Sequence, residues 1–204
     1  MKKQLSTIFA LLFSLMLSGL VYGQSDPKQT LQLSIDKLIA EFTTNRTELQ
    51  ADKQKLYAFA EQSIDDHWDF SKMAQLVLGK NWRKISDDQK TRFTTAFKGL
   101  LVRTYSTTMF KYTGKEAISF DEPIYKGKAN TRAIVNAKGS LGDGSEPIPL
   151  AFSMFLDKDG EWRIYNVAAA GISLVTTYRT SYGQIIAGKG IDHLIDLLNA
   201  KAKA

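Results

Sequence analysis

The sequence contains no cysteine, which excludes disulfide bonds, thiolate metal ligands and lipid attachment to an N-terminal cysteine. Only two histidines, His67 and His193, occur in the 204 residues, and neither belongs to a zinc-binding motif. No Walker-type phosphate loop and no G-x-S-x-G nucleophile motif is present. The sequence therefore offers little support for an active site, and its apolar residues carry more information.

Four polar features resemble functional motifs but have simpler explanations. Asp65-Asp66-His67 ends a predicted helix, and His193 lies between two aspartates on another, so both fit solvent-exposed helical positions. The glycine-rich segment Gly139–Gly144 joins two strands and precedes no helix, which argues against a dinucleotide-binding loop. Ser173 fits the start of a helix, where its hydroxyl would cap the first turn. We predict no enzymatic activity, no catalytic residue, no metal ligand and no cofactor.

The N-terminus has the pattern of a secretory signal peptide. Two lysines precede an apolar run over Ile8–Val21, and Val21-Tyr22-Gly23 has the small-residue character of a cleavage site. We predict a signal peptide over residues 1–23 and a single domain over residues 24–204. No later apolar run reaches the length of a membrane-spanning helix, so we expect a soluble exported protein.

The charge of the mature chain is weakly basic. Removing the two lysines of the signal peptide from the 27 basic side chains leaves 25 against 21 acidic ones, a net charge of +4. These charges are interspersed along the sequence, whereas nucleic-acid binding favours a concentrated basic stripe. We therefore expect no nucleic acid among the partners.

Hydrophobic periodicity predicts an α+β fold with N-terminal helices, a four-stranded antiparallel meander and C-terminal helices, together enclosing an apolar cavity. Ser86 and Gln89 form a capping box at the start of the strongest helix. The predicted helices cover residues 27–42, about 52–67, a short segment closed by Gly79, 86–112, 174–186 and 191 to about 200. The predicted strands cover residues 117–120, 129–138, 148–156 and 161–167.

The segment 161–182 connects the last strand to the last helices. It begins with strand alternation, passes through three alanines to Gly171, and continues with apolar residues at helical spacing. Such small residues fit a tight strand-to-helix corner, and they fit equally a wall that leaves space for a ligand. The aromatic helix 86–112 and the doubly apolar strand 148–156 fit either a cavity or a well-filled core.

Two sequence blocks resemble a known family. The first is Phe70–Gly79, with Trp82-Arg83 and the aromatic helix beyond it, and the second is Gly171–Tyr182 after Trp162–Tyr165. Together, behind a signal peptide, they resemble the periplasmic phospholipid-carrier family of the Mla pathway, the MlaC or toluene-tolerance auxiliary proteins. The resemblance covers essentially the whole mature chain. The family pattern implies an acidic residue near position 166 and often one near position 170, where this chain has asparagine and alanine.

The resemblance implies a soluble periplasmic carrier that holds the acyl tails of a glycerophospholipid in an apolar cavity. It would shuttle lipid between the two membranes and maintain outer-membrane lipid asymmetry. Its partners would be an outer-membrane lipoprotein–porin complex and an inner-membrane ABC transporter with an MCE-domain subunit. The alternatives are an exported α+β enzyme with a small-molecule pocket and an adaptor domain with a filled core.

We expect the acyl tails to contact apolar and aromatic residues of the long helix, the sheet and the last helix. These residues are Phe97, Leu101, Tyr105, Val135, Phe152, Met154, Ile164, Val175 and Tyr178. Three basic residues are candidates for the mouth of the cavity or for partner docking: Arg83, Arg163 and Arg179.

Overall fold

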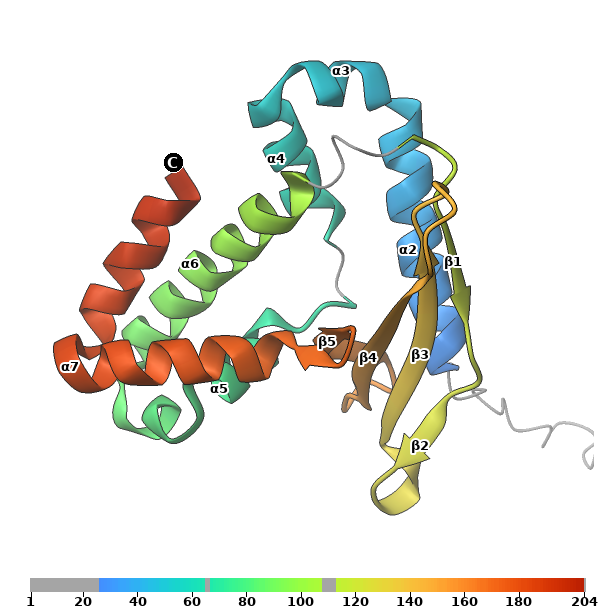
Figure 1. Ribbon diagram of the computed structural model, residues 1–204. Helices are drawn as coiled ribbons and strands as arrows, with labels where there is room; N and C mark the ends of the chain where they lie inside the picture. Colours follow the sequence, from blue (N-terminus) through green and yellow to red (C-terminus); the bar gives the residue numbers. More distant parts are fainter. Residues whose placement is uncertain (1–25, 65–66, 108–112, 204) are drawn as a thin grey trace, which may run out of the picture.

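The structure, a computed structural model, describes residues 26–64, 67–107 and 113–203 (Figure 1). The predicted signal peptide over residues 1–23, Asp65-Asp66 and the last residues of the helix predicted to reach residue 112 lie outside these ranges. The described chain forms helices, then an antiparallel sheet, then a final helix, which confirms the predicted α+β class. No helix in these ranges is both long and apolar enough to cross a membrane.

The N-terminal helices are α2 (Pro27–Thr44), α3 (Arg46–Ala51) and α4 (Lys53–Ser63). Helix α2 begins where expected, because Pro27 fits the first turn and the Asp26 carboxylate accepts a hydrogen bond from the Gln29 N–H at 2.9 Å. Helix α4 ends at Ser63, earlier than predicted, because Ile64 already has an extended backbone.

The middle helices are α5 (Phe70–Leu78), the 3₁₀ helix η1 (Gly79–Lys84) and α6 (Asp87–Ser106). The predicted capping box of α6 is confirmed. The Ser86 hydroxyl accepts a hydrogen bond from the Gln89 N–H at 3.2 Å, and the Gln89 side chain accepts one from the Ser86 N–H at 3.1 Å. Gly79 ends α5 with a φ of 53°, as its position in the sequence predicted.

Within the described residues the sheet has six strands, where four were predicted. They are β1 (Ala117–Phe120), β2 (Ile124–Lys126), β3 (Arg132–Ser140), β4 (Ile148–Leu156), β5 (Trp162–Ala169) and β6 (Ile172–Ser173). The order is β1-β3-β4-β5-β6, and β2 also pairs with β3, at the end away from β1. Pro123 separates β1 from β2, since it has no N–H to donate to the ladder. The four predicted strands are present, and β2 and β6 are additions to them. Strand β3 starts at Arg132 rather than at residue 129, because Lys128–Asn130 form the 3₁₀ helix η3.

The predicted strand-to-helix corner is a β-hairpin. Strand β5 continues to Ala169, the turn residues Ala170 and Gly171 have φ values of 48° and 79°, and Ile172 pairs back with Ala169. Two consecutive positive φ values in a two-residue loop are typical of a type I′ turn. Helix α7 (Leu174–Lys203) starts directly after β6, and the Ser173 hydroxyl accepts a hydrogen bond from the Thr176 N–H at 3.2 Å. The capping role predicted for Ser173 is therefore confirmed.

Helix α7 has an elbow at Gly190, where φ is 82° and ψ is 173°. The two predicted final helices are the two halves of α7 on either side of this elbow. Beyond it, the segment 191–203 turns back beside α6 (Figure 1). Asp192 accepts hydrogen bonds from Arg92 at 2.6 Å and from Gln89 at 2.8 Å, both of which belong to the first turns of α6.

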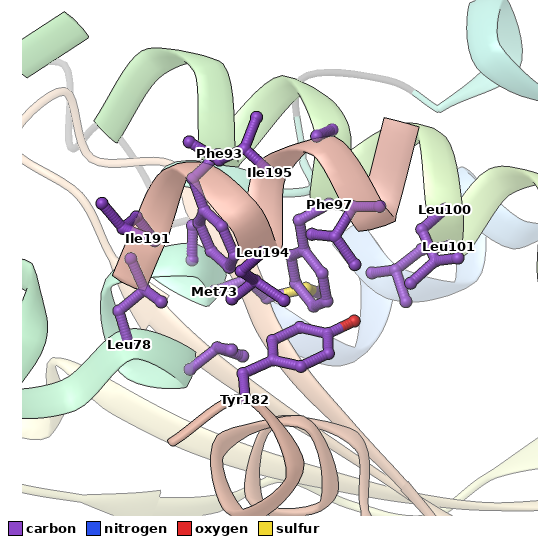
Figure 2. Close-up of a cluster of buried hydrophobic side chains, with 14 of the residues drawn as sticks. Met73, Leu78, Phe93, Phe97, Leu100, Leu101, Tyr182, Ile191, Leu194 and Ile195 are labelled. Atoms are coloured by element: carbon purple, nitrogen blue, oxygen red, sulfur yellow. The ribbon is translucent and has the colours of Figure 1, made fainter. Parts of the chain in front are cut away.

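The described residues form three hydrophobic clusters: two large cores and a small cluster of Phe42, Leu49 and Leu56 that joins α2, α3 and α4. The helical core lies among α5, α6 and α7 (Figure 2) and consists of Met73, Ala74, Val77, Leu78, Phe93, Ala96, Phe97, Leu100, Leu101, Val175, Tyr182, Ile191, Leu194, Ile195 and Leu198. The sheet core lies between the sheet and α2 and consists of Leu31, Ala133, Val135, Ala137, Phe152, Met154, Trp162 and Ile164.

Trp68 connects the two cores. Its half-buried side chain packs against both of them. Its backbone forms a parallel bridge with Ile164 of β5: the Ile164 N–H donates to the His67 carbonyl at 2.6 Å, and the Asp69 N–H donates to the Ile164 carbonyl at 2.9 Å. Both side-chain packing and hydrogen bonds thus join the segment before α5 to strand β5.

Candidate functional site

The helical core is built around the ring of Phe97. This ring stacks on Phe93 at a centroid distance of 5.7 Å and meets the ring of Tyr182 edge-on at 6.2 Å (Figure 2). The ring of Tyr178 also meets it edge-on, at 5.2 Å. Phe93 and Phe97 lie on one face of α6, and Tyr178 and Tyr182 lie on one face of α7, because residues four apart in a helix lie above one another. Such contacts stabilise an aromatic cluster beyond the burial of its surface, by about 0.5–1.5 kcal/mol for each pair.

Three tyrosines lead from this core to the surface. Tyr182 is 6% exposed, Tyr178 is half-buried, and Tyr105 is 50% exposed. Burial, with a further contribution from a hydrogen bond to Tyr105, raises the pKa of Tyr178 to about 12. The pKa of Tyr182 is also raised, first by burial and then by the neighbouring Tyr178 and Tyr105 oxygens. Both phenols therefore keep their protons at neutral pH and can act as hydrogen-bond donors.

The residues predicted to contact lipid tails fall into two groups. Phe97, Leu101, Val175 and Tyr178 lie in or against the helical core, and Tyr105 lies at its exposed edge. The remaining four lie in the sheet core: Val135, Phe152, Met154 and Ile164. The structure therefore places eight of the nine residues in or against two apolar cores, which Trp68 connects, and leaves Tyr105 exposed beside the helical core.

Three further aromatic residues belong to this region and were not among the predicted site residues. Phe93 and Tyr182 lie one helical turn from Phe97 and Tyr178, so the four-residue spacing within each helix was a usable signal. Trp68 had no such signal, because its position depends on backbone pairing with β5, nearly a hundred residues further along the chain.

The three predicted arginines lie in different places. Arg83 is exposed on η1. Arg163 is half-buried on β5 and forms an ion pair with Asp157 at 2.7 Å, beside the turn between β4 and β5. Arg179 donates from Nε to the Leu76 carbonyl at 2.7 Å, which attaches α7 to α5. Arg163 and Arg179 thus have contacts that stabilise the fold.

Asn166 caps helix α7 from the neighbouring strand. Its side-chain oxygen accepts hydrogen bonds from the Val175 N–H and from the Ser173 hydroxyl, both at 3.1 Å. This is the position at which the family pattern led us to expect an acidic residue. A carboxylate here would accept the same two hydrogen bonds and would add a negative charge at the positive end of the helix dipole.

Substitutions of Asn166 test this capping role. We expect Asn166→Ala to lower the free energy of unfolding by about 1–2 kcal/mol, because two donors at the helix start lose their acceptor. We expect Asn166→Asp to raise it by about 0.3–1 kcal/mol at pH 7. Because the helix start lowers the pKa of the new carboxyl below its unfolded value of about 3.9, the gain should be lost as the pH falls below about 4. Urea unfolding at pH 7 and pH 3 measures both effects. An Asn166→Asp protein less stable than the parent at pH 7 would contradict this role.

Across residues 26–64, 67–107 and 113–203, no group of three or more histidine, aspartate or glutamate side chains could hold a metal ion. An open pocket of about 400 Å³ lies at the elbow of α7, lined by Gln184, Ile185, Gly188, Lys189, His193 and Leu197.

The fold matches a solved structure. The chain superposes with a TM-score of 0.76 on a phospholipid-binding protein from Ralstonia solanacearum whose structure contains a phospholipid. The match is 21% identical in sequence and covers 88% of this chain and 98% of that one. The architecture of helices around an antiparallel sheet is therefore that of a known structural class.

The family is established by the sequence comparison. The model of the MlaC protein family matches residues 32–200, and the chain belongs to this family. The resemblance noted from the sequence blocks is thus confirmed. The MlaC binding protein of the intermembrane phospholipid transport system of Haemophilus influenzae is 22% identical over 205 residues, which cover 99% of this chain and 94% of that protein. The toluene tolerance protein ttg2D of Pseudomonas putida is 21% identical over 180 residues, covering 87% of this chain and 81% of that protein.

Proposed function

We propose that this protein is a periplasmic phospholipid carrier whose mature chain begins near Gln24. Membership in the MlaC family over residues 32–200 carries the proposal. The relative from Haemophilus influenzae is named as a phospholipid transport binding protein, and the structural match from Ralstonia solanacearum contains a phospholipid. The two apolar cores support the same function, as do Tyr105, Tyr178 and Tyr182, which extend from the helical core to the surface between α6 and α7.

The acyl tails contact the residues of both cores in this proposal. Phe97, Leu101, Val175 and Tyr178 receive the tails on the helical side, with Tyr105 at the surface. On the sheet side the tails meet Val135, Phe152, Met154 and Ile164. Helices α6 and α7 would move apart from the sheet as the tails enter, and Trp68 would remain the attachment. Arg83, Arg163 and Arg179 stay candidates for headgroup or partner contacts.

Such a carrier only has to bind a phospholipid about as favourably as the membrane does. Each buried CH₂ group contributes about 0.8 kcal/mol, so two acyl chains leaving water contribute on the order of 20 kcal/mol. A bilayer offers the same gain, and a cavity that matches it exchanges lipid with the membrane at nearly zero net free energy. An ATP-hydrolysing partner would then set the direction of lipid transport. The proposed partners are an outer-membrane lipoprotein–porin complex and an inner-membrane ABC transporter with an MCE-domain subunit.

Native mass spectrometry of the protein purified from cells tests the proposal. We expect a co-purifying mass that matches a glycerophospholipid, and we expect the delipidated protein to regain that mass after incubation with liposomes. Recovery of the bare polypeptide alone under gentle ionisation, with no uptake from liposomes, would refute the carrier function.

A further inference from the structure

Three side-chain polar atoms are buried without a hydrogen-bond partner among the described residues: Ser106 Oγ, Trp162 Nε1 and the Tyr182 hydroxyl. Such atoms are rare in folded proteins, because each costs about 1–3 kcal/mol when it is removed from water and left unpaired. An unpaired donor in a binding region is therefore a candidate contact for a ligand. Tyr182 is the one that lies in the aromatic cluster beside the residues proposed to receive lipid tails.

The position of the Tyr182 hydroxyl is set by its surroundings. The ring meets Phe93 and Phe97 edge-on, each at 6.2 Å, and lies 5.2 Å from the ring of Tyr178. Figure 2 shows the oxygen directed away from Leu78 and toward the side of the core where Leu100 and Leu101 lie. The only polar atom of this side chain thus points along an apolar surface rather than toward water.

The chemistry of the hydroxyl restricts its acceptor. Burial raises the pKa of Tyr182, so the group is a neutral donor at physiological pH. The Tyr178 hydroxyl already has Tyr105 as its hydrogen-bond partner. A diacyl glycerophospholipid carries its ester carbonyls between the apolar tails and the charged phosphate. The three tyrosines have the same order, from buried Tyr182 to half-exposed Tyr105.

We propose that the Tyr182 hydroxyl donates a hydrogen bond to an ester carbonyl of the bound lipid, an inference that rests on the proposed carrier function. The contact makes the site selective for ester-linked lipids. An ether-linked lipid of the same chain length has no carbonyl at this position, so it leaves the buried donor unpaired. The headgroup takes no part in this selection.

A competition between two lipids tests the inference. The delipidated mature protein is incubated with vesicles that contain equal amounts of diester and diether phosphatidylcholine with the same number of carbons in each chain, and native mass spectrometry counts each complex. We expect the parent protein to load the diester about 5-fold more than the diether, the factor that one hydrogen bond of about 1 kcal/mol produces. We expect Tyr182→Phe to load both lipids about equally.

Two controls make the result specific. Tyr165→Phe removes a hydroxyl from the ring that contacts Phe155 on the sheet, outside the aromatic cluster, and should keep the 5-fold preference. The unloaded Tyr182→Phe protein should have a Tm equal to or above that of the parent, because the hydroxyl has no partner in the described chain. Equal loading of both lipids by the parent, or an unchanged preference in Tyr182→Phe, would overturn the inference and leave the carrier function standing. Failure to load either lipid would refute both.

Discussion

Val175→Glu is expected to abolish phospholipid loading of the purified protein, and Leu33→Glu is expected to leave loading unchanged. Val175 is 6% exposed in the helical core, next to the start of α7, whereas Leu33 is 62% exposed on α2. A carboxylate at position 175 would have to be desolvated against the acyl tails, which costs several kcal/mol without a partner. At position 33 the same carboxylate stays in water. The lipid-to-protein ratio after incubation with liposomes measures the difference.

A buried charge in the sheet core should also prevent phospholipid loading. Met154 is fully buried there and pairs in register with Ala133 of β3. Because we propose that the tails reach both cores, Met154→Glu is also expected to prevent loading. Circular dichroism and gel filtration must first show that each variant is folded, since a buried charge also lowers stability. Full loading in both folded variants would place the lipid elsewhere in the molecule.

Gly190→Ala is expected to destabilise the protein, and Gly188→Ala is expected to stabilise it. Gly190 has a φ of 82° and a ψ of 173°, a backbone region that essentially only glycine adopts, so a Cβ there costs about 1–3 kcal/mol. Gly188 lies in the helical part of α7 with open space around the site of a Cβ. Alanine there should raise the free energy of unfolding by up to about 1 kcal/mol.

The elbow has this large effect because it sets the direction of the last part of α7. The segment beyond Gly190 buries Ile191, Leu194, Ile195 and Leu198 in the helical core, and a changed direction of the chain would remove all four. Thermal unfolding measures the effect, with roughly 2–4 °C expected for each kcal/mol in a chain of this size. A Gly190→Ala protein with the Tm of Gly188→Ala would show that the elbow is not required.

Locally encoded features were predicted from the sequence with the greatest success. The start of α6 depends on Ser86 and Gln89, which are three residues apart, and the end of α5 depends on Gly79 alone. The hairpin after β5 was missed because a type I′ turn favours asparagine or glycine, whereas its first position is Ala170. Strand β2 was missed because its three residues are all exposed and therefore lack alternation.

The division of the site into two cores could not be predicted from periodicity. An apolar residue at helical or strand spacing is expected to be buried, but the spacing does not identify what covers it. Phe97 and Phe152 have equally clear patterns and lie in different cores. The contacts that decide this, such as the bridge between Trp68 and Ile164, join distant parts of the chain. The cap on α7 from Asn166 is likewise non-local, since it crosses the hairpin.

The bridge at Trp68 also protects the sheet from other chains. An edge strand with unpaired N–H and C=O groups can pair with a neighbouring molecule and start aggregation. Along β5 the outer N–H and C=O of Ile164 are occupied by His67 and Asp69, and β6 pairs with Ala168 and Ala169 further along. At the opposite edge, β1 and β2 are short and are interrupted at Pro123. Both borders of the sheet are therefore poor templates for the addition of a strand from a second molecule.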